Sequence, residues 1–322
     1  MVSLLAPSAS EGPAAHADWL ELRALEAADR NSSIQDLVQV IRRTGTIEAI
    51  EADDEAEADD EAEDIEDRGA EKSQAVAEDA FIEIEDRFTA CGGVRGVYPF
   101  RVAAQYIELR EDGKGSVYLF LLLLARFGKD AGPTGSDGAR LFELVCVQAA
   151  AAYFGGKGSR VGSYHFGAPR RSTPRSFVDA LNDMCRQMGE GQGCRVDRPN
   201  LQDQKDAKLD LTVWRPFLDG RVGQLMGFGQ CATGRDWPDK VTHLQPETFC
   251  ALWMRDTPAV SPVRLFFVPF RIEQRRWLDA TRYGGIIFDR CRIAVYGRSF
   301  DRELLEQCVG WTDHVLREQL RS

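Results

Sequence analysis

The sequence lacks the long apolar run that a membrane protein requires. No stretch reaches 18 consecutive apolar residues, and the longest, Val117–Ala125, has nine, which is too short to span a bilayer. The first residues, Met1–Pro13, have neither the basic region nor the apolar segment of a secretory signal. We therefore expect a cytoplasmic protein that makes no membrane contact.

Paired cysteines are also missing. The chain has eight cysteines with no CxxC pair among them, and only four histidines. A structural zinc site, which uses closely spaced Cys and His ligands, therefore has little support. We expect reduced and mostly buried thiols at the eight positions: Cys91, Cys146, Cys185, Cys194, Cys231, Cys250, Cys291 and Cys308.

Two common catalytic motifs are absent as well. Without GxxxxGK[ST] the chain is not expected to hydrolyse ATP by a P-loop mechanism. Without GxSxG it has no nucleophile elbow. The glycine-rich segment 155–159 resembles a phosphate-binding loop in composition, but it follows a predicted helix, and we interpret it as the helix end.

Charge is distributed unevenly along the 322 residues, whose formal net charge is −11. Residues 1–87 carry 7 basic and 25 acidic side chains, and residues 88–322 carry 33 basic and 26 acidic ones. Glu48–Asp67 alone holds 13 acids and no base. The negative charge thus belongs to the first part of the chain, and the remainder is basic enough for a nucleic-acid partner.

The same pattern predicts the domain organisation. Residues 1–46 are expected to form a helical segment, and residues 47–80 an acidic, low-complexity linker that has too little apolar surface to fold. Residues 81–322 are expected to form an α/β domain with its core at about residues 137–300. A homo-oligomer is compatible with this organisation.

Within the large domain, the apolar pattern changes from helical to extended periodicity. We predict helices over Asp137–Phe154 and Arg175–Met188, separated by a loop at Gly158–Pro174. Lys208–Trp214 and Gly223–Cys231 alternate as the strands of a hairpin. Further expected elements are an apolar segment at Val117–Phe127, strands at Arg264–Phe270, Gly285–Asp289 and Arg292–Tyr296, and helices at Glu273–Arg282 and Asp301–Leu320. Together these predict a mixed central β-sheet flanked by helices, with a helical N-terminal region.

Three oxygen-bearing side chains occupy unusual places in this pattern. Glu143 lies on an otherwise apolar helix, where an unpaired charge costs several kcal/mol. Asp210 falls between apolar residues of the first hairpin strand, and Gln230 ends the second. The turn near Asp219-Gly220 places Asp210 and Gln230 roughly opposite one another. Carboxylate and amide oxygens in this arrangement suit a hard cation such as Mg²⁺.

These residues resemble the PD-(D/E)XK, or restriction endonuclease-like, nuclease superfamily. Its core has a helix bearing an acid, followed by a hairpin with Asp on its first strand and Glu, Asp or Gln on its second. The segments KLDLTVW and FGQCATG provide the hairpin, with Asp210 and Gln230 in the motif positions and Glu143 on the preceding helix. The resemblance covers residues 137–300 at most. It implies Mg²⁺ or Mn²⁺ held by Glu143, Asp210 and Gln230, and hydrolysis of DNA phosphodiester bonds.

The sequence departs from this pattern at one position. The motif has Lys two residues after the Gln, and here that residue is Ala232. In some members of the superfamily the lysine moves to a neighbouring helix, and Lys240 is the nearest candidate. Lys208, two residues before Asp210 and on the same strand face, is the competitor. If neither lysine reaches the site, the chain is a catalytically degenerate subunit that binds DNA or a partner protein.

Arginines dominate the basic residues of the second part, where only six of 33 are lysines. Their planar guanidinium groups suit phosphate contacts. Arg170, Arg171 and Arg175 form one candidate DNA-binding cluster, and Arg275 with Arg276 forms another.

Two further alternatives remain at this stage. Cys231 with His243 downstream would suit a thiol hydrolase. The resemblance also implies a role in bacterial restriction or antiviral defence beside a partner ATPase or helicase. For a nuclease, the run Glu48–Asp67 has two possible functions. It is a solubilising tether, or it lies over the basic surface in place of phosphate and restrains the enzyme.

Overall fold

The computed structural model describes residues 7–52, 62–155, 160–167, 176–195, 197 and 205–320. It divides the chain into two compact units, one formed by Met1–Leu119 with Thr312–Ser322 and the other by Phe120–Trp311. No helix in these described ranges is both long and apolar enough to cross a membrane.

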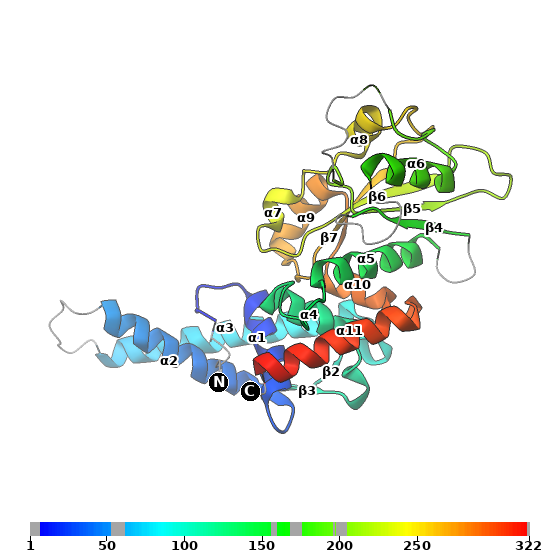
Figure 1. The fold of residues 1–322 in the computed structure, drawn as a ribbon. Coiled ribbons are helices and arrows are strands. Elements are labelled where there is room, and N and C mark those ends of the chain that lie inside the picture. Colours follow the sequence, from blue (N-terminus) through cyan, green and yellow to red (C-terminus); the bar gives the residue numbers. More distant parts are fainter. Residues whose placement is uncertain are drawn as a thin grey trace. The chain divides into compact units, whose positions relative to one another are not determined.

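The first unit packs helices against a small antiparallel sheet whose strand order is β1-β3-β2 (Figure 1). Its main elements are α1 (Pro13–Glu26), β1 (Asn31–Ser33), α2 (Ile34–Ala52), α3 (Ala62–Ala90), β2 (Phe100–Val102) and β3 (Tyr106–Leu109). Short 3₁₀ turns at Gly93–Arg95 and Glu111–Gly113 connect them.

A buried arginine joins the helices of this unit. Arg87 is fully buried, and its Nη1 lies 2.7 Å from Oδ1 of Asp18 and 3.0 Å from Oε2 of Glu21. The hydroxyls of Tyr98 and Tyr118 both donate to Oε1 of Glu21. The charges in this core are therefore paired and hydrogen-bonded, which a buried ion pair requires.

The acidic stretch differs from the expected linker. Residues 47–52 complete α2 and residues 62–80 form the first part of α3, so these parts are helical. Alanine and glutamate, which dominate the stretch, have high helix propensity, and this outweighs the repulsion between neighbouring acids. Residues 53–61 lie outside the described part of the chain.

The second unit is built on a five-stranded mixed sheet of order β4-β5-β6-β7-β8. The β4–β5 and β5–β6 pairs are antiparallel, and the β6–β7 and β7–β8 pairs are parallel. The strands are β4 (Gly162–His165), β5 (Leu211–Arg215), β6 (Leu225–Cys231), β7 (Val263–Phe267) and β8 (Ile286–Phe288). The predicted α/β class with a mixed sheet flanked by helices is confirmed.

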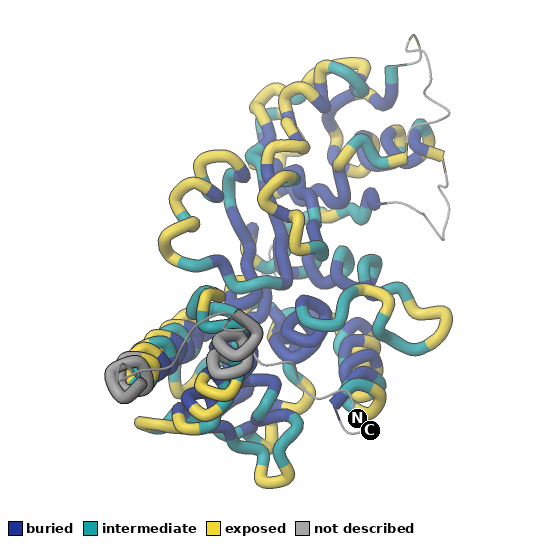
Figure 2. Tube along the Cα trace, turned by 90° about the vertical axis from the view of Figure 1, so that its left-hand side faces the viewer, coloured by how far each residue is buried: buried dark blue, intermediate teal, exposed yellow. Residues whose placement is uncertain are grey.

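Helices cover both faces of this sheet. On one face α5 packs its Phe154 against Gly227 of β6. On the other face Phe228 of β6 contacts Phe249 of α8, in a buried cluster that also contains residues of α6. The α-helices described wholly within the unit are α5 (Gly138–Phe154), α6 (Phe177–Met188), α7 (Trp237–Lys240), α8 (Pro246–Trp253), α9 (Gln274–Gly284) and α10 (Arg290–Tyr296). Figure 2 shows the buried residues concentrated in the strands and the inner sides of these helices.

Most of the predicted elements are confirmed. The apolar segment is the helix α4 (Val117–Phe127), and α5 begins after Asp137, whose side chain accepts a hydrogen bond from the Arg140 N–H. The last predicted helix appears as α11 (Arg302–Val315), followed by a π-helical turn at Leu316–Leu320. The eight cysteines are free thiols, and all except Cys231 are buried.

The predictions of local structure for residues 292–296 and 158–174 were wrong. Residues 292–296 belong to α10 and do not form a strand, because Oδ1 of Asp289 accepts the Arg292 N–H and caps a helix there. The expected loop at Gly158–Pro174 contains β4, which pairs with β5 from Gly162↔Trp214 to His165↔Leu211. This pairing depends on β5, some 50 residues further along the chain, and is not visible in the local pattern.

Candidate active site

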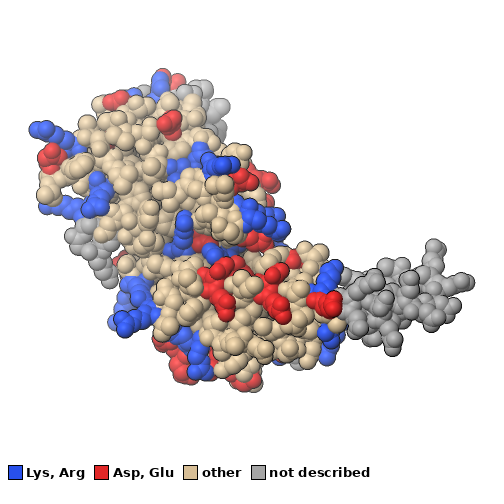
Figure 3. All heavy atoms as spheres, turned by 180° about the vertical axis from the view of Figure 1, so that it is seen from behind, with Lys and Arg blue, Asp and Glu red and all other residues tan. Residues whose placement is uncertain are grey.

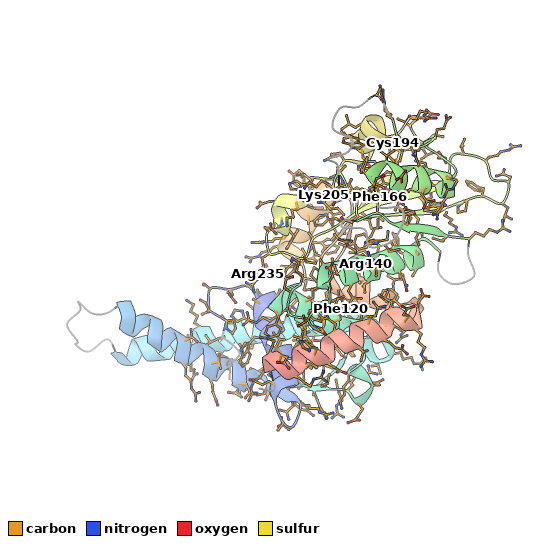
Figure 4. The ribbon with its side chains drawn as sticks, in the orientation of Figure 1. Phe120, Arg140, Phe166, Cys194, Lys205 and Arg235 are labelled. Atoms are coloured by element: carbon orange, nitrogen blue, oxygen red, sulfur yellow. The ribbon has the colours of Figure 1, made fainter. Side chains whose placement is uncertain are left out.

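Asp210 lies at the point where β5 begins. It directly precedes the strand instead of falling inside it, but its N–H still donates to Gly229 O across the ladder. Its carbonyl accepts the N–H groups of Phe166 and Gly167, which follow β4. Figure 4 labels Phe166 beside the sheet and Arg140 near the start of α5. The sheet and α5 are the two elements that frame the site. The backbone of Asp210 is therefore fixed from both neighbouring strands.

The Asp210 side chain is buried, with 9% of the residue exposed. Its Oδ2 accepts the Cys231 N–H at 2.7 Å. Burial raises the pKa of this carboxyl well above its ordinary value, and the negative charge of Glu143 raises it further. The Cys231 hydrogen bond acts in the opposite direction but does not offset these effects.

Glu143 projects from α5 toward the end of β4. Its Oε2 accepts a hydrogen bond from Nε2 of His165 at 2.6 Å, so the partner of this acid is a histidine and not the arginine that an ordinary structural ion pair would supply. Gly167 packs directly on the same carboxylate, because a Cβ atom at that position would lie 2.2 Å from Glu143 Oε2. The histidine and the glycine together fix the orientation of the carboxylate.

Two thiols complete the surroundings of the acids. Cys146, one turn after Glu143 on α5, and Cys231, at the end of β6, are neighbours whose thiols interact. Burial raises the pKa of the Cys231 thiol well above its ordinary value, and the neighbouring thiol and acids add to the effect. Cys231 is therefore held as a neutral thiol, which is a poor nucleophile. The alternative of a thiol hydrolase loses support.

Gln230 lies opposite Asp210 as predicted, but its side chain forms a hydrogen bond with a different segment. The β5–β6 register pairs Leu211 with Gly229, which places Asp210 opposite Gln230. The Gln230 side chain, however, shares the face of β6 with Phe228, and its Oε1 accepts the Leu244 N–H at 3.2 Å. Its amide oxygen thus holds the segment after α7 against the strand. The carboxylates of Glu143 and Asp210 interact with one another, and Gln230 does not join them in this structure.

The two candidate lysines have different surroundings. Lys240 ends α7, where its Nζ lies 2.8 Å from Oδ1 of Asp236. Lys208 was expected on the strand face of Asp210, and that prediction was wrong because Lys208 occupies a turn with φ of 70° before the strand begins. Its positive charge nevertheless lowers the pKa of Asp210, so Lys208 acts on the buried carboxyl.

The arginine clusters are placed only in part. Arg170, Arg171 and Arg175 lie outside the described residues. Arg275 is exposed at the start of α9 and its Nε lies 2.5 Å from Glu273, while Arg276 beside it is also exposed. On the face drawn in Figure 3, lysines and arginines are distributed among acidic and uncharged residues.

His165 and Gly167 are the site residues that sequence reasoning missed. Both lie in the segment Gly158–Pro174, which was expected to be a loop. The one local signal is the short alternation of Ser163 and His165 with two aromatic residues, which is typical of a strand. Nothing in the sequence pairs His165 with Glu143, which lies 22 positions earlier.

Within the described parts of the chain, no three His, Cys, Asp or Glu side chains form a group that would hold a metal ion by themselves. The chain matches no family model, no curated protein and no solved structure in comparisons with each. Function is therefore argued from the site alone.

Proposed function

We propose that this chain is a Mg²⁺-dependent nuclease of the PD-(D/E)XK type that hydrolyses phosphodiester bonds in DNA. The order of its elements supports the proposal. A helix carrying an acid, α5, precedes a hairpin with Asp210 at the start of its first strand and Gln230 at the end of its second. This is the order that the resemblance implies.

The observation that carries the proposal is a pair of neighbouring acids, with Asp210 buried and Glu143 half-buried. Gly167 donates its N–H to the Asp210 carbonyl and packs on the Glu143 carboxylate, which brings the two acids together, and the charge of Glu143 raises the pKa of Asp210. Such an arrangement is uncommon in a core that serves stability alone and is typical of functional sites. A bound cation would remove the repulsion.

The donor chemistry fits Mg²⁺. This ion is usually bound by one or two carboxylates, with water and substrate phosphate as its other ligands, so Glu143 and Asp210 suffice from the protein. Mn²⁺ accepts the same oxygen ligands. When bound, the cation would lower the pKa of a water molecule and offset the charge that develops on the phosphate.

Residues of the chain supply the remaining functions. His165 and Gly167 orient Glu143, and the Cys231 N–H orients Asp210. A lysine near the acids would hold the attacking water and stabilise the transition state. Lys208 is favoured over Lys240, because its charge already acts on Asp210 while Lys240 is paired with Asp236.

The biological role follows by analogy with the superfamily. A chain that joins such a core to a separate helical unit suits bacterial restriction or antiviral defence, with a partner ATPase or helicase supplying the motor function. The absence of a P-loop motif from this chain is compatible with a separate motor.

Two observations favour a second candidate, a degenerate nuclease fold that binds DNA or a partner protein without cutting. Ala232, at the lysine position of the motif, is buried and carries no charge. The amide of Gln230 is also committed to Leu244. Both features remove expected catalytic groups.

The test compares wild type with Asp210→Ala on plasmid DNA in the presence of Mg²⁺ and any cognate partner. We expect nicking or cutting by the wild-type protein, and its loss in the variant, because Asp210 would hold the cation. Lys208→Ala should reduce cleavage more than Lys240→Ala.

Three results would contradict the nuclease proposal. Activity that survives Asp210→Ala but is lost in Cys231→Ser would indicate thiol chemistry. Cleavage unaffected by both substitutions would place the active site elsewhere. Tight DNA binding without cleavage under any metal or partner would establish the degenerate subunit.

A further inference from the structure

A polar cavity distinct from the candidate active site lies on the same unit, at the start of β7. Its volume is about 330 Å³, and its lining comes from the start of α8, the beginning of β7 and the end of α9. Two arginines, Arg264 of β7 and Arg282 of α9, line it together with Tyr283, whose ring is exposed. No sequence motif pointed to this cavity, because its residues come from three separate elements.

Arg264 is a partly buried cation without a carboxylate partner in the described residues. Its terminal nitrogens donate to the carbonyl of Tyr283 and to Oε1 of Gln245, both neutral groups, and its Nε has no hydrogen-bond partner. Burial lowers the pKa of this guanidinium, and no acid raises it. An anion bound beside Arg264 would supply the missing counter-charge.

The start of α8 adds donors to the same cavity. Gln245 precedes the helix without a side-chain cap, and the N–H groups of Glu247 and Thr248 lie in the first turn, where no helical acceptor is available. The N-terminus of a helix favours anions. Glu247 is the opposing feature, because its carboxylate also lines the cavity. With Arg282, held only by an exposed contact of 3.8 Å to Asp279, two cations face one acid.

We propose that this cavity binds a backbone phosphate of DNA through Arg264, Arg282 and the first N–H groups of α8. The identity of the ligand as DNA rests on the proposed function, and the phosphate chemistry rests on the cavity itself. Residue Arg264 pairs with Phe228 of β6, two residues from Gln230 and two strands from Asp210. At ordinary strand spacings the backbones of Arg264 and Asp210 are about 12 Å apart.

The experiment measures binding of a fluorescent DNA duplex without divalent ions, so that no cleavage is needed, over a range of salt concentrations. Arg282→Gln and Arg264→Gln should each weaken binding and reduce the slope of log K against log salt by about 1, which is the contribution of one phosphate contact. Glu247→Gln should strengthen binding. Arg302→Gln, an exposed helix arginine paired with Glu306, is the matched control and should change neither quantity.

The outcomes separate this inference from the nuclease proposal. Arginine-dependent binding without any cleavage would retain the phosphate site and reject the nuclease. Cleavage by wild type, with salt slopes unchanged in the arginine and Glu247 variants, would reject the phosphate site alone. Arg264→Gln removes two structural hydrogen bonds. If that variant fails to fold, Arg282→Gln and Glu247→Gln carry the test. Thermal stabilisation by inorganic phosphate, with DNA binding unaffected by these substitutions, would assign the cavity to a free anion and overturn the DNA source.

Discussion

Two acids of like charge lie in one site, Asp210 buried and Glu143 half-buried, and each has few donors. Asp210 receives the Cys231 N–H, and Glu143 receives the His165 imidazole. A core selected for stability would replace one of these acids by an apolar or amide side chain. Their presence therefore indicates a trade of stability for binding, which is common in functional sites.

Replacing Asp210 by Asn is expected to raise the thermal stability of the metal-free protein at neutral pH. The amide keeps an oxygen to accept the Cys231 N–H and removes the repulsion from Glu143. We expect a gain of about 1–2 kcal/mol, equivalent to an increase in Tm of about 3–6 °C. Thermal unfolding in a chelator measures it.

The pH dependence of the same comparison has a definite sign. Because the pKa of Asp210 is raised in the folded state, its contribution to stability is fully present below its ordinary pKa of 3.8 and is lost as pH rises through the folded value. The advantage of Asp210→Asn should therefore grow as pH increases from about 4. Added Mg²⁺ should stabilise the wild type and leave the variant unchanged. A constant difference in Tm across pH would contradict this account, and the exposed Asp219→Asn serves as the control.

His165 is expected to act through Glu143 as a positioning residue. Removing its imidazole in His165→Ala frees the carboxylate, and loss of such a partner typically weakens metal binding by about 10–100-fold. The Mg²⁺ concentration that gives half the maximal shift in Tm measures this effect. His165→Gln, whose amide N–H can donate to the same oxygen, should restore part of the affinity. Equal Mg²⁺ dependence in wild type and His165→Ala would limit His165 to a packing role.

At the scale of elements, local patterns predicted the hairpin that carries Asp210 and Gln230. The turn residues Asp219-Gly220 fix the centre of the hairpin, so counting outward from them gives the pairing, and the register confirms it. The same counting cannot show that the Gln230 side chain turns to Leu244. That bond depends on where the segment after α7 packs, which is a tertiary property.

The positions of His165 and Gly167 could not be predicted from local sequence either, because they also depend on tertiary contacts. β4 has four residues and only becomes a strand by pairing with β5, so His165 and Gly167 were assigned to a loop. Capping could be read locally for α5, where Asp137 precedes the helix. It was overlooked for α10, where Asp289 plays the same part after an apolar strand. Helix ends and turns are specified by a few consecutive residues, whereas the pairing partners of a short strand come from distant parts of the chain.

The turn end of the β5–β6 hairpin depends on one buried carboxylate. Oε1 of Glu190 accepts the Gly223 N–H at 2.9 Å and the side-chain amide of Gln224 at 3.2 Å, and Oε2 accepts the Ala259 N–H at 3.0 Å. Glu190→Ala should leave these donors unsatisfied and lower the free energy of unfolding by about 2–4 kcal/mol. Urea denaturation measures it. Glu303→Ala, an exposed helix acid, should cost far less, and a loss below about 1 kcal/mol for Glu190→Ala would show that water replaces the carboxylate.

At the scale of the whole molecule, the net negative and net positive charge belong to different parts of the chain. The proposed phosphate-binding residues and both acids of the site belong to the unit Phe120–Trp311, whereas the acidic run Glu48–Asp67 belongs to the other unit. A run of 13 acids is expected to compete with DNA for basic groups, over a distance set by the salt concentration.

This asymmetry predicts that the acidic run weakens DNA binding at low salt. Deleting residues 48–67 should raise the affinity for duplex DNA, because fewer basic side chains are then neutralised by the chain itself. Replacing the acids of the run by Gln and Asn, with the length of the chain kept, should give the same increase, which separates the effect of charge from that of chain length. The gain should decrease as salt rises, since screening at about 1 M shortens the range of these interactions to about 3 Å. Fluorescence anisotropy over a salt series measures both variants against wild type. Unchanged affinity in both would limit the run to a solubilising tether, and an increase in the deletion alone would indicate that the length of the segment, and not its charge, obstructs DNA.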